Sequence, residues 1–376
     1  MSTAAHKSPF TDWTVVVPLV SLLALVFSWG RDLPGFAVAL IALCLGGAVL
    51  AAVHHAEVVA LRVGEPFGSL VLAVAVTVIE VALIVTLMAD GGDKTASLAR
   101  DTVFAAVMIT CNGIVGLSLL VGALHNRVAV FNAEGSGAAL ATVATLATLS
   151  LVLPTFTTSK PGPEFSTAQL AFAAFASLAL YGLFIAVQTV RHRDYFLPVA
   201  TEAGAKKPDG SGDGDGDGEH AEPPGSRAAL VSLGLLLVAL VAVVGDAKAV
   251  SPTIETGVAK AGLPNAVVGV IIALLVLAPE TLAAVRAARR DRVQTSLNLG
   301  YGSAIASIGL TIPAIALATI WLSGPLLLGL GPIHMVLLAL TVVVSALTIA
   351  PGRATLLQGG VHLVLLAAYL FLAVSP

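Results

Sequence analysis

One stretch of the chain, residues 70–88, is apolar almost throughout and carries a single carboxylate, Glu80, in its middle. About 20 apolar residues suffice for a helix to cross the hydrocarbon core of a bilayer. A charged side chain at that depth costs about 2.5–3.5 kcal/mol on insertion scales, so Glu80 is expected to have a partner or a functional role. Residues 267–285 repeat the pattern around Glu280. The two stretches predict a pair of membrane-embedded glutamates and a cation pathway.

The composition of the whole chain predicts an integral membrane protein. Hydrophobic residues make up 57% and charged residues 11% of its 376 positions, whereas soluble domains carry about 25% charged residues. The lipid bilayer is therefore an expected partner, and no basic block indicates nucleic acid. Cys44 and Cys111 lie inside apolar spans without metal-ligand spacing and are predicted to be packing residues. The sequence indicates no particular oligomeric state.

Eleven apolar segments predict an all-α, polytopic protein of about eleven transmembrane helices, or ten if the first is peripheral or a weak pair merges. The predicted spans are residues 13–29, 36–60, 68–89, 101–123, 137–153, 167–189, 228–247, 265–287, 299–320, 330–349 and 355–374. The predicted organisation is an N-terminal tail with the first helix (1–35), a first five-helix repeat (36–190), an acidic linker rich in Gly and Asp (191–227) and a second five-helix repeat (228–376).

The basic residues orient these predicted helices. Most of the 19 Lys and Arg residues, including Lys7, Arg62 and Arg191, fall on one side of an eleven-helix arrangement. Because cytoplasmic loops carry the excess of basic residues, the N-terminus and the 191–227 linker are predicted to be cytoplasmic. The linker is too polar to form a core and is predicted to be a solvated connection. Its Asp-x-Asp-x-Asp-Gly run begins like a calcium-binding loop, which leaves weak regulatory cation binding as a second interpretation.

A short internal match relates the two halves. Glu57 and Glu255 are each followed by a glycine seven residues later and by a proline two residues after that. Five helices in each half give the halves opposite orientations, and inverted repeats with a site at their interface are a transporter architecture. We therefore expect Glu80 and Glu280 to converge near the midplane. Glu57 and Glu255, near helix ends, are candidate gate or proton-relay carboxylates.

Oxygen atoms near the two glutamates are expected to complete a cation site. Pro279 removes an intrahelical hydrogen bond and releases a carbonyl near Leu275, although a simple packing kink is the alternative interpretation. Thr77 offers a hydroxyl one turn before Glu80. Carboxylate, carbonyl and hydroxyl oxygens suit hard cations such as Ca²⁺ or Na⁺.

Polar residues on the helices that follow each glutamate are further candidates. Asn112 lies deep in an apolar span, where its amide serves either a cation or a helix–helix hydrogen bond. Gly300, Ser303 and Ser307 share one helix face, with Asn298 close to its edge. The hydroxyls on this face can line a pore, while the glycine alternatively serves close packing.

With these motifs, the chain resembles the cation/calcium exchanger superfamily, and most closely its ChaA-type bacterial calcium (sodium, potassium)/proton antiporters. The resemblance is strongest in residues 76–83, 99–116 and 279–303. It implies two inverted five-helix repeats preceded by an extra helix, an acidic cytoplasmic linker, and a cation site built around Glu80 and Glu280. It also implies a multi-pass protein of the bacterial inner membrane that transports Ca²⁺, Na⁺ or K⁺ against H⁺ and needs no cofactor.

The chain departs from this pattern just before each glutamate. Many calcium/proton exchangers of the superfamily carry Gly-Asn there, where this chain has Val76 and Thr77 in one half and Val276 and Leu277 in the other. Fewer side-chain oxygens leave Na⁺ or K⁺ open as the cation in place of Ca²⁺.

The mechanism that these residues predict is antiport by competition. Glu80 and Glu280 hold a cation when ionised, and they take protons when it leaves because bare charges are costly in a dry site. A channel-like cation pore is the main alternative. An intramembrane enzyme is disfavoured because the sequence offers neither a nucleophile with an adjacent base nor a metal triad.

Overall fold

The fold is almost entirely helical, as predicted. The computed structural model describes residues 12–31, 33–64, 67–91, 95–199, 224–322 and 324–375. Within these ranges two short strands, β1 (Ala129–Val130) and β2 (Arg353–Ala354), pair antiparallel. The predicted linker falls mostly on residues 200–223, which lie outside the described residues.

The first half of the chain contains an extra helix and five spans, three of which include a π-helical segment. In chain order the elements are α1 (Trp13–Ser28), α2 (Gly35–Val63), α3 (Phe67–Gly91), α4–η3–α5 (Leu98–Met108, Ile109–Ile114, Val115–Asn126), α6–η4–α7 (Ala133–Ala147, Thr148–Val152, Leu153–Phe156) and α8–η5 (Thr167–Ala186, Val187–Arg191), followed by the 3₁₀ turn η6 (Arg193–Phe196). The π-helical segments η3 and η4 lie inside otherwise continuous spans, as single-turn bulges of this kind usually do, whereas η5 forms the end of its span.

The second half contains five further helices. They are α9 (Ser226–Lys260), α10 (Ala266–Arg289), α11 (Val293–Ala318), α12 (Pro332–Ile349) and α13 (Leu356–Val374). Over the described residues, nine helices are long and apolar enough to cross a membrane, and two shorter apolar helices, Trp13–Ser28 and Val74–Ala89, bring the count to the predicted eleven. Because five crossings reverse the direction of the chain, the two halves are inverted repeats.

One predicted boundary is wrong. The span predicted at 228–247 continues as helix to Lys260 and passes through Pro252. The charges of Asp246 and Lys248 end the apolar stretch in the sequence, but the structure buries Asp246 completely among neighbouring helices. A buried charge can therefore hide the continuation of a span that hydropathy alone would end.

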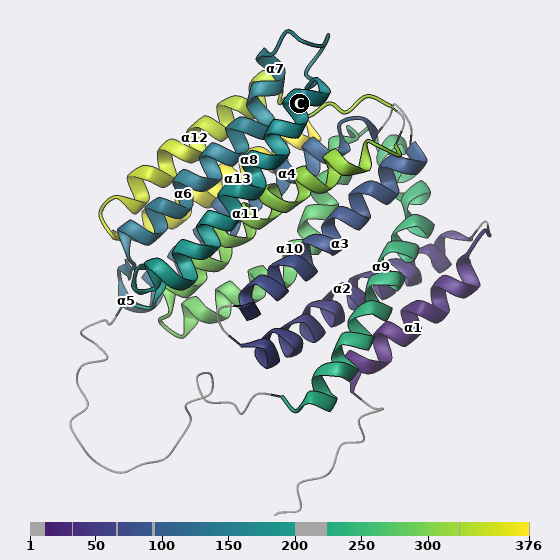
Figure 1. Cartoon of the computed structure of the whole chain (residues 1–376), viewed down its shortest axis with the longest axis horizontal. Coiled ribbons are helices and arrows are strands. Elements are labelled where there is room, and N and C mark those ends of the chain that lie inside the picture. Colours follow the sequence, from purple (N-terminus) through teal and green to yellow (C-terminus); the bar gives the residue numbers. More distant parts are fainter. Residues whose placement is uncertain are drawn as a thin grey trace, which may run out of the picture.

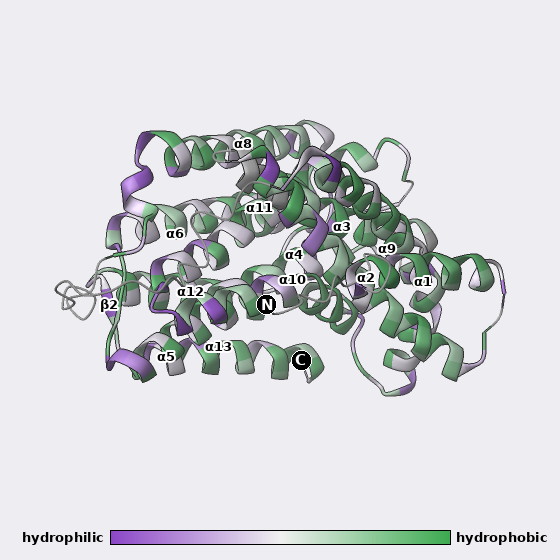
Figure 2. Cartoon of the chain, turned by 90° about the horizontal axis from the view of Figure 1, so that it is seen from below, coloured by the Kyte–Doolittle hydropathy of each residue, from purple (hydrophilic) through white to green (hydrophobic). Residues whose placement is uncertain are grey.

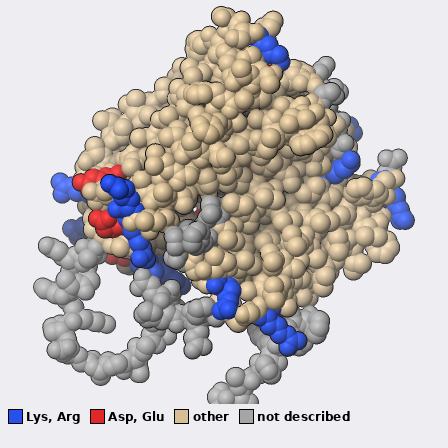
Figure 3. Space-filling view, in the orientation of Figure 1, with Lys and Arg blue, Asp and Glu red and all other residues tan. Residues whose placement is uncertain are grey.

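The outer surface is suited to lipid. Large apolar side chains such as Leu43, Trp321 and Leu357 are at least 74% exposed, and apolar residues dominate the helices in Figure 2. In Figure 3 the charged residues gather at the rim, which leaves a broad uncharged area across the visible face. Together with the apolar spans, this arrangement makes the chain a multi-pass membrane protein.

The helices are arranged as two groups with α3 and α10 between them. Helices α1, α2 and α9 pack against one another on one side of the molecule (Figure 1), and α4–η3–α5, α6, α8, α11, α12 and α13 form the larger body on the other. Helices α3 and α10, which carry the two glutamates, occupy equivalent positions in the two repeats. The fold thus brings both glutamates to the middle of the bundle.

A close helix contact in the body joins α5 to α13 through Gly116 and Gly359. A Cβ atom on Gly359 would lie 2.7 Å from the backbone nitrogen of Leu120 and 3.0 Å from the carbonyl oxygen of Gly116. Small residues at such positions allow helix backbones to approach within a membrane. On the next residue, Gly360, a Cβ atom would meet nothing within 4 Å.

We predict that Gly359→Ala destabilises the protein while Gly360→Ala does not. The added methyl at Gly359 meets backbone atoms that cannot rotate away, and overpacking of this kind costs about 1–3 kcal/mol. The measurement is the midpoint of thermal unfolding of the purified protein in detergent. Equal midpoints for the two variants would contradict the close α5–α13 contact.

Candidate functional site

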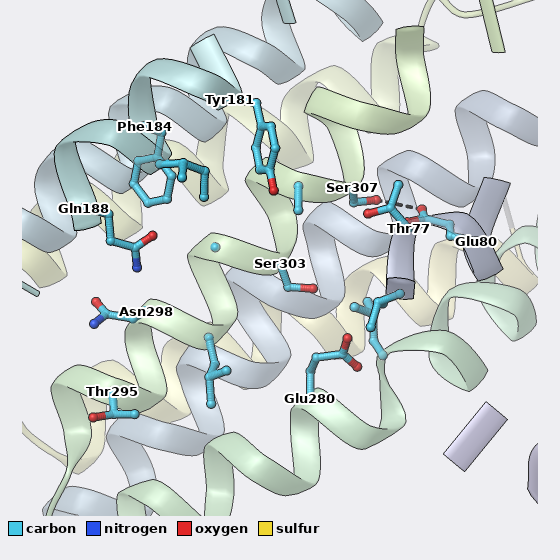
Figure 4. A pocket seen from close by; sticks show the side chains of 16 residues that line it. Thr77, Glu80, Tyr181, Phe184, Gln188, Glu280, Thr295, Asn298, Ser303 and Ser307 are labelled. Atoms are coloured by element: carbon cyan, nitrogen blue, oxygen red, sulfur yellow. Dashed lines mark hydrogen bonds between the residues drawn. The ribbon is translucent and has the colours of Figure 1, made fainter. Parts of the chain in front are cut away.

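A cavity of about 220 Å³ lies between α3, α8, α10 and α11 and contains both predicted glutamates at its wall (Figure 4). Its lining residues are Val76, Thr77, Glu80, Tyr181, Phe184, Ile185, Gln188, Leu277, Glu280, Thr295, Asn298, Leu299, Gly302, Ser303, Ala306 and Ser307. The apolar residues of this set make most of the wall nonpolar, and the hydroxyl, amide and carboxyl groups give it a few polar positions. This is the composition expected of a small-ligand or ion site.

Glu80 is held by a hydroxyl group from the opposite repeat. Its side chain is only 5% exposed, and the Ser307 hydroxyl donates to its Oε1 at 2.6 Å. Thr77, one turn earlier on α3, lies beside this pair in Figure 4. A hydrogen bond to a charged group is worth about 1.5–3 kcal/mol, so Ser307 favours the ionised carboxylate in an otherwise apolar setting.

Glu280 faces the same space without such a partner. Its Oε2 is buried and accepts no hydrogen bond from any residue that the structure describes. Figure 4 shows its carboxyl group pointing toward the region bounded by Ser303 and Glu80. Glu80 lies close enough for its charge to act on Glu280. An unpartnered carboxyl group beside a second one is a costly arrangement unless a cation or a proton is present.

The cavity follows the first half of α11 toward one end of the bundle. It extends from Ser307 and Ser303 to Thr295, which lies three residues after Arg292. Gln188 lines the same end, three residues before Arg191, from which the linker departs. The described cavity therefore runs from mid-helix depth to the bundle end that carries the linker.

Asn298 closes this end rather than lying beside the glutamates. Its Nδ2 donates to the carbonyl oxygen of Phe196 at 2.6 Å, and its Oδ1 accepts from Gln294 at 2.8 Å. The bond to Phe196 ties α11 to the 3₁₀ turn η6, and the bond from Gln294 lies within α11. Asn298 lines the cavity as well, and its Oδ1 can accept a second hydrogen bond.

Asn112 is not among the residues that line the cavity. It is fully buried in η3, where its Nδ2 donates to Thr341 at 2.9 Å and its Oδ1 accepts from His362 at 3.1 Å. Its amide thus links the α4–η3–α5 span to α12 and α13. This contact corresponds to the helix–helix alternative of its two predicted roles.

Glu57 and Glu255 also lie outside the cavity, near opposite ends of the bundle. Glu57 is exposed on α2 and lies within electrostatic reach of Arg286. Glu255 accepts from Ser251 at 3.0 Å and lines a second cavity of about 220 Å³ together with Asp101. Neither carboxylate contacts the Glu80–Glu280 cavity directly.

One predicted residue packs outside the cavity, and sequence reasoning missed others that line it. Of the two roles left open for Gly300, the structure shows close packing against Ile114 and Val115, while the residues of α11 that line the cavity include Leu299 and Gly302. The residues missed by sequence reasoning are Tyr181, Gln188 and Thr295. Their only signal in the sequence is a polar group within, or at the end of, an apolar span.

The described residues contain no group of three or more His, Cys, Asp or Glu side chains that could hold a metal ion. A cation in the cavity would therefore take its remaining ligands from hydroxyl groups, backbone carbonyls or water. Ser303, Ser307 and Thr77 supply hydroxyls, and Pro279 has no N–H to occupy the carbonyl of Leu275. Such oxygen ligands are those preferred by Ca²⁺ and Na⁺.

The fold and the cavity define a polytopic membrane protein with an interior, carboxylate-lined site. The family described as sodium/calcium exchanger protein matches residues 33–190 and 231–375, and the chain belongs to this family. Its relatives are transporters, so the chain is a cation exchanger and not an enzyme. The resemblance to the cation/calcium exchanger superfamily is thereby confirmed.

Individual relatives cover nearly the whole chain. A protein of Sinorhizobium fredii named as an ionic transporter, y4hA, is 43% identical over 97% of this chain and 96% of its own. The sodium-potassium/proton antiporter ChaA of Escherichia coli is 34% identical over 97% of each chain. The crystal structure of an H⁺/Ca²⁺ exchanger, CAX, covers 95% of this chain and 86% of its own with a TM-score of 0.65 at 15% identity, which is a likeness of fold.

We predict that Ser307→Ala weakens cation binding, whereas Thr311→Val does not. Ser307 is the described donor to Glu80, and loss of about 1.5 kcal/mol corresponds to roughly tenfold in apparent affinity. Thr311 is a matched control because it is buried one turn further along α11 but does not line the cavity. The measurement is the cation concentration for half-maximal transport in proteoliposomes. Equal half-maximal concentrations in the two variants would show that Ser307 does not contribute to the cation site.

Proposed function

We propose that the protein exchanges a metal cation for protons across the membrane by competition at Glu80 and Glu280. The observation that supports this proposal is that the two glutamates, one from each inverted repeat, line a single cavity at mid-helix depth. Thr77 and Ser303 are proposed as further cation ligands. Asn298 is proposed to contact the cation at the end of the cavity nearest the linker.

The competition follows from the cost of charge in this cavity. Two ionised carboxylates without a counterion repel each other and lack water, so the empty pair is stable only when it is protonated. A bound cation neutralises the two carboxylates in place of the protons. Because cation and protons cannot occupy the pair together, movement of one species in one direction is coupled to movement of the other in return.

The proposed cation is Ca²⁺, with Na⁺ or K⁺ as the second candidate. Two carboxylates match the charge of one divalent ion, and hydroxyl and carbonyl oxygens are its usual further ligands. The second candidate is favoured by two observations: Val76 and Val276 stand where a glycine precedes an asparagine in many calcium exchangers, and a relative at 34% identity is named as a sodium-potassium/proton antiporter.

The proposed location is the bacterial inner membrane, with the N-terminus and the linker in the cytoplasm. Basic residues such as Arg191, Arg289 and Arg292 stand at the bundle end that the cavity approaches. Under the positive-inside rule this end is cytoplasmic. The structure then represents a form in which the glutamates are approached from the cytoplasm, with Glu57 and Glu255 proposed as gate or relay groups on the two sides.

We predict that Glu80→Gln and Glu280→Gln each abolish cation-driven proton movement. The amide keeps the size of the side chain but can neither release a proton nor neutralise a cation. Proteoliposomes with a trapped pH dye, challenged with CaCl₂, NaCl or KCl, give the measurement and identify the cation. Glu164→Gln is the control, because Glu164 pairs with Lys160 in the α7–α8 connection, outside the cavity. Near-normal transport by either cavity variant would contradict the proposed site.

We also predict that the apparent affinity for the cation falls as the pH is lowered. More protons then compete for the same carboxylates, and mass action weakens the affinity by up to about tenfold per pH unit for each competing proton. The measurement is the half-saturating cation concentration at several pH values. A channel-like pore would instead show flux that needs no proton countermovement, and flux measured with and without a pH gradient separates the two cases.

A further inference from the structure

A third carboxylate lies inside the bundle and takes no part in the cavity. Asp246, at the middle of α9, is 0% exposed, and neither of its carboxyl oxygens has a hydrogen-bond partner among the residues that the structure describes. It is not among the residues that line the Glu80–Glu280 cavity. Nothing in the competition at the two glutamates uses it.

The surroundings of Asp246 are small and apolar. It shares a face of α9 with Ala239, Ala242, Val243 and Val250, all of which are buried. The neighbouring Gly245 packs against Leu25 of α1. The side chain therefore lies within the group formed by α1, α2 and α9 (Figure 1).

No opposite charge faces this carboxyl group from the described parts of the helices packed on α9. Helix α1 has no titratable residue. On α2, the Cys44 thiol lies within electrostatic reach of Asp246. The acidic groups of α3 and α10 with described side chains are Glu80 and Glu280, which face the cavity. The remaining titratable groups of α2, which are His54, His55, Glu57 and Arg62, lie in its last ten residues, and Arg286 and Arg289 lie in the last turn of α10. Lys248 on α9 lines a separate groove that opens between α1, α3 and α9.

An isolated carboxylate in such a place is strongly unfavourable, so the group is neutral in this conformation. A neutral acid holds one proton, and at 0% exposure that proton cannot exchange with water while α2 and α9 remain packed together. Packing alone does not account for the residue, because alanine or valine would fill the same space without an unpartnered polar group.

We propose that Asp246 is a further proton-binding site, separate from the Glu80–Glu280 pair, that releases its proton when the contact between α2 and α9 opens. This inference rests on the proposed antiport and adds to the protons of the Glu80–Glu280 pair one further proton, carried by Asp246. Protonation of Asp246 would favour the packed arrangement of α2 and α9, and ionisation would favour the open one, so that the contact between these two helices depends on proton concentration.

The bound proton can be detected without transport. In the full-length protein with Glu80→Gln and Glu280→Gln, infrared spectroscopy should show a protonated-carboxyl band that shifts when aspartate is labelled with ¹³C and that disappears on adding Asp246→Asn. The labelling requires no substitution at Asp246, so the test stands even if Asp246→Asn does not fold. Absence of a label-sensitive protonated band would overturn the proposal.

Transport provides the second test. In proteoliposomes, Asp246→Asn should lower the number of protons moved per cation by one and flatten the pH profile, and Asp246→Glu should restore both. Ser21→Ala is the matched control, because Ser21 is buried on α1 and donates to the carbonyl of Cys44 on α2, within the same group of three helices. An unchanged ratio in Asp246→Asn would overturn the proposal. If the unsubstituted protein moved no protons while the infrared band persisted, the proposed antiport would fail and the proton site would stand.

Discussion

The cost of placing a carboxyl group in a dry, apolar interior governs this structure. Glu80 and Glu280 lie at the middle of apolar helices, where each must be neutralised by a proton or paired with a cation. In the proposed antiport, the same cost that makes these residues rare in membrane helices gives them their use, because the pair is stable with either ligand and unstable with neither. The rest of the fold brings the two groups to one largely apolar cavity.

The cavity exists because one helix combines small residues with hydroxyl groups. On α11, Gly302 and Ala306 leave space, while Ser303 and Ser307 supply oxygens at the same level. The hydroxyl of Ser307 reaches across to Glu80 of the other repeat. The site is thus built from both halves of the chain, so neither repeat would form it alone.

Much of the architecture could be predicted from hydropathy, because about twenty apolar residues have few alternatives to a membrane helix. The sequence also singled out Glu80, Glu280, Thr77, Ser303 and Asn298, all of which line the cavity. It did not show which way a helix faces, so the role of Gly300 stayed open between pore and packing, and Gln188 was overlooked. The span predicted at 228–247 ended too early, because hydropathy counts the charge of Asp246 but does not register its burial. These failures concern side-chain direction, which depends on packing between distant segments.

The small β1–β2 pairing joins the loop after α5 to the loop after α12, and it therefore links one repeat to the other. The backbone of Asn132, which follows β1, also donates to Gln294 of α11 at 2.7 Å. At this end of the molecule the connections of α5, α6, α11, α12 and α13 are consequently fastened into one frame, whereas α1, α2 and α9 are not part of it. This frame cross-braces the two repeats of the larger body at one end, so the segments on either side of the β1–β2 pairing cannot shift past each other there without breaking it.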